Sequence, residues 1–326
     1  MCGALVRDRQ PRANTFDIAE PSQHRWYLGS RIECERIETQ APPAGVLAAW
    51  SDGDCSYILR KISADIAPPE SQDHVSKDIH LVHEGGSSSA VWAIGKSAFC
   101  KVKYWHPSLG LEGDTIAFVR EHVPQIPVPE VIYSWIDEDR TFLILKRVQG
   151  VTLRDAWSSF SSLQRDLILK EIASICDLLA LKTSAKLQSV SGKALPERFL
   201  AVAKDGFVGP LTSTESLEYF TVLDSNLCPK IGKDFYLYHA DLGPGNIMVS
   251  KDGSITGILD WEAAGFYPRF WIATKPSVAP GLDFSPPIAG IEEFEWRKRL
   301  RLELESRGYP QASAWYMKWR RARPKK

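Results

Sequence analysis

The chain has 326 residues, 44% of them hydrophobic and 25% charged, which suits one large or two modest packed domains and excludes a mainly disordered protein. Its 40 Lys and Arg residues balance 40 Asp and Glu residues, so no net charge attracts nucleic acid or an anionic membrane, and we expect neither as a partner. Six widely spaced cysteines form no Cys-x-x-Cys or zinc-ligand pattern, which indicates reduced thiols.

The chain has no apolar segment of the kind that directs export or membrane insertion. Only four apolar residues occur together near its beginning, far fewer than the apolar core of a secretory signal, and no run approaches the roughly 20 apolar residues that span a bilayer. We therefore expect a cytoplasmic protein. Its oligomeric state cannot be read from the sequence.

The first part of the chain divides into an extension and a small lobe. Residues 1–80 have weak periodicity and are interpreted as an N-terminal extension of unclear structure. Residues 81–149 are predicted to form a nucleotide-binding N-lobe. The segment 81–105 alternates like three antiparallel strands, joined by a glycine-serine turn and by a turn at Gly95.

The rest of the predicted small lobe is one helix and two strands. Ile116, Val119 and Val123 recur at helical spacing from about Glu112 to Val123, before a proline-rich stop. Residues 131–136 and 141–148 read as strands around a polar turn. The pattern therefore predicts five strands with one helix between the third and the fourth.

Residues 150–326 are mostly helical in pattern and are interpreted as a C-lobe that carries the catalytic loop and the substrate site. After Ser161 one apolar stripe is predicted, made of Leu163, Leu167, Ile168, Ile172, Ile175 and Leu179. A single hairpin interrupts the helices between residues 246 and 260. The predicted fold class is therefore α+β, with a small β-rich N-lobe and a larger, mainly helical C-lobe.

The C-terminal region invites two interpretations. Residues 291–308 read as an amphipathic helix that ends at Gly308, and a basic, tryptophan-rich segment follows. The basic end could contact nucleic acid or a membrane. We favour a packed aromatic helix with a solvated tail, because no other basic run accompanies it.

The segment YHADLGPGNIMVSKDGSITGILDWE carries the strongest chemical signal. His239 precedes Asp241 by two residues, Asn246 follows Asp241 by five, and Asp260 closes the hairpin, a spacing shared with kinase catalytic loops. Phosphoryl transfer needs a carboxylate to accept the proton of an attacking hydroxyl, which fits Asp241. It also needs oxygen ligands for Mg²⁺, which Asn246 and Asp260 offer.

These residues resemble the aminoglycoside phosphotransferase and choline kinase superfamily, and its fungal branch in particular. The matching segments are residues 239–246, 258–271, 85–88, 101–102 and 115–135. The resemblance implies a two-lobed protein-kinase-like fold. It also implies ATP- or GTP-dependent phosphorylation of a hydroxyl on a small molecule, with Mg²⁺ as the metal.

Such a site needs a strand lysine, held by a helix glutamate, for the nucleotide phosphates. The family-like Lys-Val order favours Lys101 over Lys103. Glu112 shares the buried face of its helix and is the predicted partner, with Asp114 and Glu121 as competitors. Alternatively, Glu112 only stabilises the helix N-terminus through the macrodipole.

The turn Gly85, Gly86, Ser87 and Ser88 could lay backbone N–H groups and hydroxyls over the phosphates. An ordinary hairpin turn has the same composition. Only its place between the first two strands of the small lobe favours phosphate binding.

The chain departs from the family pattern at several positions. Ala240 stands where most relatives have Gly, and Ile272 stands where many fungal relatives have an acid. No Ala-Pro-Glu follows Asp260, which favours a small acceptor over a protein. Glu262 is either an acid near the metals or a structural carboxylate.

A catalytically degenerate nucleotide-binding or scaffold protein is the alternative to an active kinase. The retained residues Lys101, Asp241, Asn246 and Asp260 argue against it. Two metal-facing acids would repel each other without a cation between them, so a non-catalytic fold has no physical need for both.

Overall fold

The computed structural model describes residues 18–39, 43–62, 77–85, 88–221, 228–284, 287, 290 and 294–323. The chain divides into two compact units. The first consists of Met1–His106 and Glu130–Arg147, and the second of Pro107–Pro129 and Val148–Lys326.

The first unit begins with a five-stranded antiparallel sheet of order β1-β2-β3-β5-β4, here called the N-terminal sheet. Its strands are β1 (Ile18–Ser22), β2 (Arg25–Leu28), β3 (Ile32–Ile37), β4 (Ala48–Asp52) and β5 (Cys55–Lys61). The predicted extension of unclear structure is therefore regular over most of residues 18–61. In β3, buried Ile32 and Cys34 alternate with partly exposed Glu33 and Glu35, the pattern of a strand with one covered face.

The second sheet of this unit, here called the small-lobe sheet, has the order β6-β7-β8-β10-β9. Its strands are β6 (Ile79–Gly85), β7 (Ser89–Ile94), β8 (Ala98–Tyr104), β9 (Val131–Asp137) and β10 (Arg140–Lys146). The five strands predicted from the sequence are confirmed, and β8 lies in the middle of the sheet. Gly95, at the turn between β7 and β8, has a φ of +58°, in the left-handed region that glycine adopts without strain.

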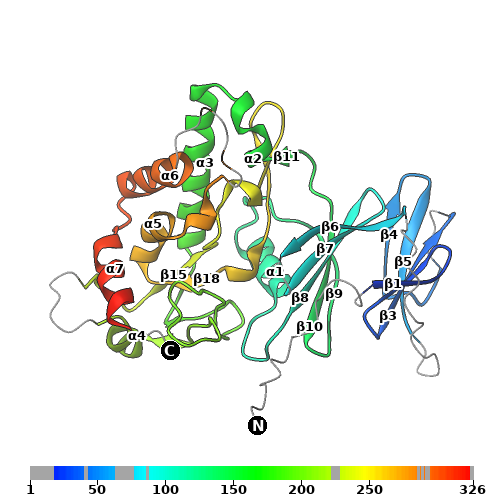
Figure 1. Cartoon of the computed structure of the whole chain (residues 1–326), viewed down its shortest axis with the longest axis horizontal. Helices are drawn as coiled ribbons and strands as arrows, with labels where there is room; N and C mark the ends of the chain where they lie inside the picture. The colour runs from blue at the N-terminus through cyan, green and yellow to red at the C-terminus, as the bar shows by residue number, and fades with distance from the viewer. Residues whose placement is uncertain are drawn as a thin grey trace, which may run out of the picture. The chain divides into compact units, whose positions relative to one another are not determined.

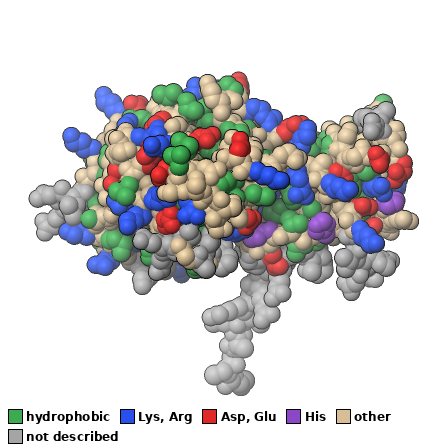
Figure 2. Space-filling model, turned by 90° about the horizontal axis from the view of Figure 1, so that it is seen from above, with side chains coloured by type: hydrophobic (Ala, Val, Ile, Leu, Met, Phe, Trp, Pro, Cys, Tyr) green, Lys and Arg blue, Asp and Glu red, His purple; other side chains and the backbone are tan. Residues whose placement is uncertain are grey.

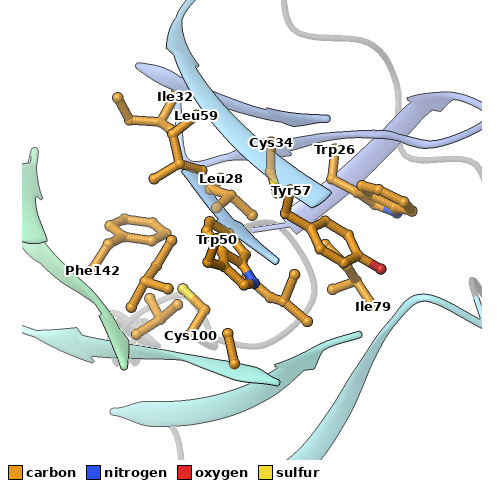
Figure 3. Packing of buried hydrophobic residues seen from close by; sticks show 14 of the residues in the cluster. Trp26, Leu28, Ile32, Cys34, Trp50, Tyr57, Leu59, Ile79, Cys100 and Phe142 are labelled. Carbon is orange, nitrogen blue, oxygen red and sulfur yellow. The ribbon is translucent and has the colours of Figure 1, made fainter. Parts of the chain in front are cut away.

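The two sheets lie face to face and share one hydrophobic core (Figure 1). Trp26, Trp50 and Leu59 of the N-terminal sheet belong to the same buried cluster as Cys100 and Phe142 of the small-lobe sheet. Figure 3 shows these side chains filling the space between the two sets of strands. Neither sheet therefore has a separate core on this face.

The second unit holds the helices of the described chain. They are α1 (Glu112–His122), α2 (Leu153–Ala156), α3 (Ser162–Ala180), α4 (Ser213–Phe220), α5 (Arg269–Val278), α6 (Glu295–Ser306) and α7 (Ser313–Ala322). Helix α3 begins with a capping box between Ser161 and Gln164, and α6 packs against both α3 and α5. The helix predicted at 112–123 is confirmed as α1.

The predicted apolar stripe of α3 is only partly buried. Ile168, Ile172 and Leu179 are covered, whereas Leu163 is 68% exposed and Leu167 is 56% exposed. The stripe predicted from the sequence is therefore buried only from Ile168 onward. Hydrophobicity alone does not show which part of an apolar stripe other elements cover.

Short strands connect the helices of the second unit. They are β11 (Val151–Thr152), β12 (Thr183–Ser184), β13 (Lys186–Leu187), β14 (Leu211–Thr212), β15 (Phe235–Tyr238), β16 (Ile247–Val249), β17 (Ile255–Ile258) and β18 (Gly265–Tyr267). Strands β16 and β17 form the predicted hairpin, with Ile247 opposite Ile258. A β-rich first unit and a mainly helical second unit confirm the predicted α+β fold.

Helix α7, in the basic C-terminal segment, packs through its aromatic side chains within the second unit, and residues 324–326 lie outside the described residues. Trp315, Tyr316 and Trp319 of α7 are buried, as expected for a packed aromatic helix. Arg320 donates to the carbonyl of Ala201 at 2.6 Å.

The face in Figure 2 shows Lys and Arg side chains interspersed with Asp and Glu. None of the helices in the described ranges combines the length and apolarity needed to cross a membrane.

Candidate active site

The loop after β15 holds Asp241 and Asn246 in direct contact. The Asn246 side-chain Nδ2 donates to the Asp241 carboxylate at 3.0 Å and to the Asp241 carbonyl at 2.9 Å. An amide whose nitrogen donates to a carboxylate keeps its oxygen for another partner, such as a cation. The sequence-predicted base and one predicted metal ligand are therefore neighbours.

The β16–β17 hairpin brings Asp260 back to the beginning of this loop. The backbone N–H of Leu259 donates to the carbonyl of Asn246 at 2.8 Å, so Asp260 follows directly after a residue bonded to Asn246. Asp260 has a φ of +63°, a left-handed conformation that aspartate tolerates better than most residues. The hairpin thus joins Asn246 and Asp260, as the spacing predicts.

His239 holds the loop that carries Asp241 through two hydrogen bonds. Its ring is fully buried, Nε2 lies 3.0 Å from the Leu259 carbonyl, and Nδ1 accepts from the Asp241 backbone N–H at 3.2 Å. These two partners assign the proton to Nε2 and leave the imidazole neutral. His239 therefore ties the Asp241 loop to the end of β17, without itself facing solvent.

Ala240, between His239 and Asp241, has a φ of +62°. An L-residue with a Cβ is strained in this left-handed region, whereas glycine is not. The chain therefore holds a strained residue next to the candidate base, a feature that often accompanies functional loops.

Two further carboxylates, those of Glu112 and Glu262, lie close to Asp260 at the end of the hairpin. Carboxylate oxygens of Glu112, Asp260 and Glu262 all lie within 4.8 Å of one another, a grouping that could hold a metal ion. Glu112, at the beginning of α1, also accepts a hydrogen bond from the backbone N–H of Trp261 at 3.1 Å. The oxygen-only donor set, with the Asn246 amide nearby, fits a hard cation such as Mg²⁺.

The environment of Asp241 makes it a stronger base than an ordinary aspartate. Burial, followed by the negative charge of Asp260, raises the pKa of Asp241 to about 6. Lys275 opposes this rise, while Glu262 and Glu197 add to it. Asp241 therefore stays ionised at neutral pH, with a pKa close to the range of an effective general base.

Two supporting contacts have no signal in the sequence. The buried indole N–H of Trp296 in α6 donates to the Leu242 carbonyl at 3.0 Å, across 54 residues of sequence. Glu197, which is 1% exposed, forms an ion pair with Lys275 of α5 and accepts from the Trp271 indole at 3.3 Å. Such contacts depend on tertiary packing, so no local pattern could have revealed them.

The predicted nucleotide residues of the first unit lie on its small-lobe sheet. Lys101 and Lys103 of β8 share the face opposite the buried Cys100 and Val102. The pairing of Lys101 with Glu112 stays a prediction, because Glu112 belongs to the other unit.

The predicted phosphate turn is described only at its ends. Gly85 ends β6 opposite Ser89, and the hydroxyl of Ser88 donates to the Gly85 carbonyl at 3.4 Å. Gly86 and Ser87 lie outside the described residues. The role of this turn in binding phosphate stays a prediction.

The second unit also has a cavity of about 520 Å³ that includes none of these residues. Tyr236, Arg269, Phe270 and Trp315 are among its lining residues. It reaches β15 at Tyr236, near the beginning of the strand, whereas Asp241 follows the strand's end. A large cavity and the acidic cluster are therefore separate features of this unit.

Comparison with known proteins identifies the family. A sequence model described as the phosphotransferase enzyme family matches residues 51–271, more than half of the chain. No curated protein matches the sequence.

Solved structures match much of the chain at low identity. The crystal structure of an aminoglycoside-3'-phosphotransferase of type VIII is 19% identical, with 76% of this chain and 93% of that chain covered and a TM-score of 0.45. Aminoglycoside phosphotransferase APH(3'')-Id from Streptomyces rimosus is 18% identical, with the same coverage and a TM-score of 0.45. At these identities the likeness says nothing about the substrate of this chain.

Proposed function

The chain belongs to the phosphotransferase enzyme family, and from this membership and the geometry of its acidic loop we propose that it transfers the γ-phosphate of ATP to a hydroxyl of a small molecule. Asp241 is the proposed catalytic base, and Asn246 and Asp260 are the proposed metal ligands. Lys101, with Glu112 and the turn at Gly85, Gly86, Ser87 and Ser88, is proposed to bind the nucleotide phosphates.

The single observation that carries the proposal is the contact of Asn246 with Asp241 beside the acids of the hairpin. The Asn246 amide holds Oδ2 of Asp241, which leaves Oδ1 to accept the proton of an alcohol. As the alcohol oxygen bonds to the γ-phosphorus, the bond from that phosphorus to the β–γ bridging oxygen breaks and ADP leaves. The alcohol proton ends on Asp241, whose raised pKa favours this transfer.

The carboxylates of Glu112, Asp260 and Glu262 support a magnesium site. Charges this close repel one another unless protons or a cation compensate them. We propose that Asp260 and the Asn246 amide oxygen hold Mg²⁺, with Glu112 and Glu262 as the neighbouring acids. When bound, Mg²⁺ would neutralise charge on the nucleotide phosphates.

The test is phosphate transfer by the purified protein with Mg²⁺-ATP and a panel of hydroxylated small molecules, with detection of both ADP and the phosphorylated product. With an accepted substrate, Asp241→Ala should lower kcat by about 10²-fold or more, the usual contribution of a general base. Asp252→Ala is the matched control, because Asp252 is an exposed acid in the turn of the same hairpin.

Two outcomes would contradict the proposal. Full activity of Asp241→Ala on an accepted substrate would remove Asp241 from the base role. Magnesium-dependent nucleotide binding without transfer to any acceptor would indicate the degenerate nucleotide-binding protein instead.

A further inference from the structure

The strand that carries Lys101 is supported from behind by the N-terminal sheet. Ala98, Cys100 and Val102 of β8 are fully buried in the core shared by the two sheets. Successive side chains of a strand point to opposite faces, so Lys101 lies on the other, partly exposed face, between two buried neighbours in sequence. In Figure 3, Trp50 and Leu59 of the N-terminal sheet and Cys100 of β8 point into the same core from opposite sheets.

A carboxylate of the N-terminal sheet also fixes the turn that leads into β8. Asp52, the last residue of β4, accepts from the backbone N–H of Lys96 at 3.0 and 3.1 Å through its two oxygens. The Ser97 hydroxyl donates to the Ser51 carbonyl at 3.1 Å. Lys96 and Ser97 directly precede β8, so these bonds set where the strand begins.

A carboxylate of the small-lobe sheet makes the equivalent contact with a turn of the N-terminal sheet. Asp137, the last residue of β9, is 3% exposed and accepts from both the backbone N–H and the hydroxyl of Ser30, the latter at 2.8 Å. In both turns a glycine with positive φ precedes the donor: Gly29 at +66° and Gly95 at +58°. A Cβ at either glycine would collide with the carboxylate, so glycine is required for the approach. Two reciprocal carboxylate contacts therefore join the sheets.

We propose that the N-terminal sheet is a positioning element for nucleotide binding, which holds β8 through its buried face and through Asp52 so that Lys101 stays aligned with the phosphates. The inference rests on the proposed role of Lys101. A lysine has a flexible four-carbon stem, so the strand beneath it must be fixed if the ammonium is to meet a phosphate without further ordering cost. The packing and both carboxylate contacts supply that support.

A purely structural role for the sheet makes a different prediction from a positioning role. If the sheet only stabilises the fold, any loss of stability elsewhere should weaken nucleotide binding equally. If it positions Lys101, loss of the Asp52 contact should weaken binding more than an equal loss of stability in the other unit.

The experiment compares Asp52→Ala with Asp177→Ala. Asp177 of α3 is a matched carboxylate in the helical unit, where it accepts from Arg307 at 2.6 Å and from Tyr309 at 2.8 Å. The readouts are the Kd of a non-hydrolysable ATP analogue with Mg²⁺, measured by calorimetry, and amide hydrogen exchange of residues 98–104.

For Asp52→Ala we expect Kd to rise about fivefold or more, the effect of one lost hydrogen bond, with faster exchange in β8. Asp177→Ala should change Kd by less than about twofold at a similar loss of thermal stability, since it leaves β8 untouched. Asp52→Asn keeps an acceptor oxygen for the Lys96 amide, so it should restore most of the affinity.

The wild-type Kd is measured first, so the two proposals fail separately. A wild-type protein that binds no nucleotide overturns the proposed function, and the positioning role with it, before any variant is made. If the wild type binds, equal Kd values for Asp52→Ala and wild type, or equal losses in both alanine variants, overturn the positioning role alone. Should Asp52→Ala fail to fold, Ser97→Ala, which loses the bond to the Ser51 carbonyl, takes its place, and wild-type affinity of that variant overturns the inference.

Discussion

Asp241→Asn is expected to stabilise the protein above pH 6 while it removes the proposed base. Burial and the charge of Asp260 raise the pKa of Asp241 from its ordinary value of 3.8 to about 6. The ionised side chain is therefore less stable in the folded protein than in the unfolded chain. Asparagine removes the charge, and its oxygen can still accept from Asn246, which now donates to Asp241 at 3.0 Å.

The magnitude follows from the two pKa values. The folded state binds the proton more tightly than the unfolded state, so the free energy of unfolding falls as pH rises from about 4 to about 6. The cost of ionised Asp241 is about 1.5 kcal/mol at pH 5 and approaches about 3 kcal/mol at pH 8, at about 1.4 kcal/mol for each pKa unit. The stabilisation by asparagine should grow between these two pH values by the same difference.

The assay is urea unfolding of both proteins in a chelating buffer at pH 5, 6, 7 and 8. Asp252→Asn is the control with the opposite sign, because hydrogen bonds from Ser250 and Ser254 lower the pKa of Asp252. That exposed substitution should destabilise at neutral pH. Adding Mg²⁺ should shrink the advantage of Asp241→Asn, since a cation compensates the charge that asparagine removes.

Two results would refute the reasoning. If folded Asp241→Asn is no more stable than wild type at pH 8 without metal, then burial and the neighbouring acids do not act on Asp241 as described. A stability gain that does not change between pH 5 and pH 8 would likewise show that packing, and not charge, is responsible.

Three further substitutions test the surroundings of the site. Glu197→Gln should destabilise the protein by about 3–5 kcal/mol, because it leaves Lys275 buried without its carboxylate. Denaturant unfolding measures this, and a loss below about 1 kcal/mol would contradict it. Ala240→Gly should raise the free energy of unfolding by up to about 1 kcal/mol, since glycine relieves the positive φ; a lower denaturation midpoint would show that the loop is not strained. Trp296→Phe removes the donor to the carbonyl of Leu242, the residue after Asp241. It should lower kcat about two- to tenfold and leave KM for the nucleotide unchanged. An unchanged kcat would mean that the loop keeps its geometry without this bond.

Local patterns predicted the elements whose signals lie close together in sequence. The small-lobe strands alternate, and Gly95 marks a turn that needs a positive φ, so strand and turn agree. The hairpin between Asn246 and Asp260 was predicted for the same reason, with Gly253 in its turn at a φ of +94°. Short-range turn chemistry fixed the register of both.

The N-terminal sheet was not predicted because its strands are short and because two strands that pair in it, β3 and β5, are not consecutive in sequence. Strand β3 pairs with β5, with Cys34 opposite Leu59, so the strand between them in sequence lies at the edge of the sheet. The alternation of Glu33, Cys34 and Glu35 was the available signal. Six residues of alternation do not distinguish a half-buried strand from a loop unless a covering partner is known.

At the site, the sequence predicted the residues that motif spacing brings together and missed those that hold them. The contact of Asn246 with Asp241, and the return of the hairpin to Asp260, follow from local spacing. Trp296 reaches the loop from a helix of another part of the chain. The choice of Glu112 as a functional acid came from its helical face, yet its contact with the Trp261 backbone depends on how α1 packs.

The buried ion pair explains how a lysine can lie near the candidate base without making it too weak. Burial and the charge of Asp260 raise the pKa of Asp241, while Lys275 lowers it and Glu197 raises it. On its own, Lys275 would lower the pKa of Asp241 and so make it a weaker base. Glu197, which pairs with Lys275, opposes its effect, and the two largest influences, burial and the charge of Asp260, decide the direction in which the pKa moves. The strained Ala240 and the buried, ionised Asp241 both lower the stability of the folded protein, and the proposed reaction at Asp241 gives a reason to retain them.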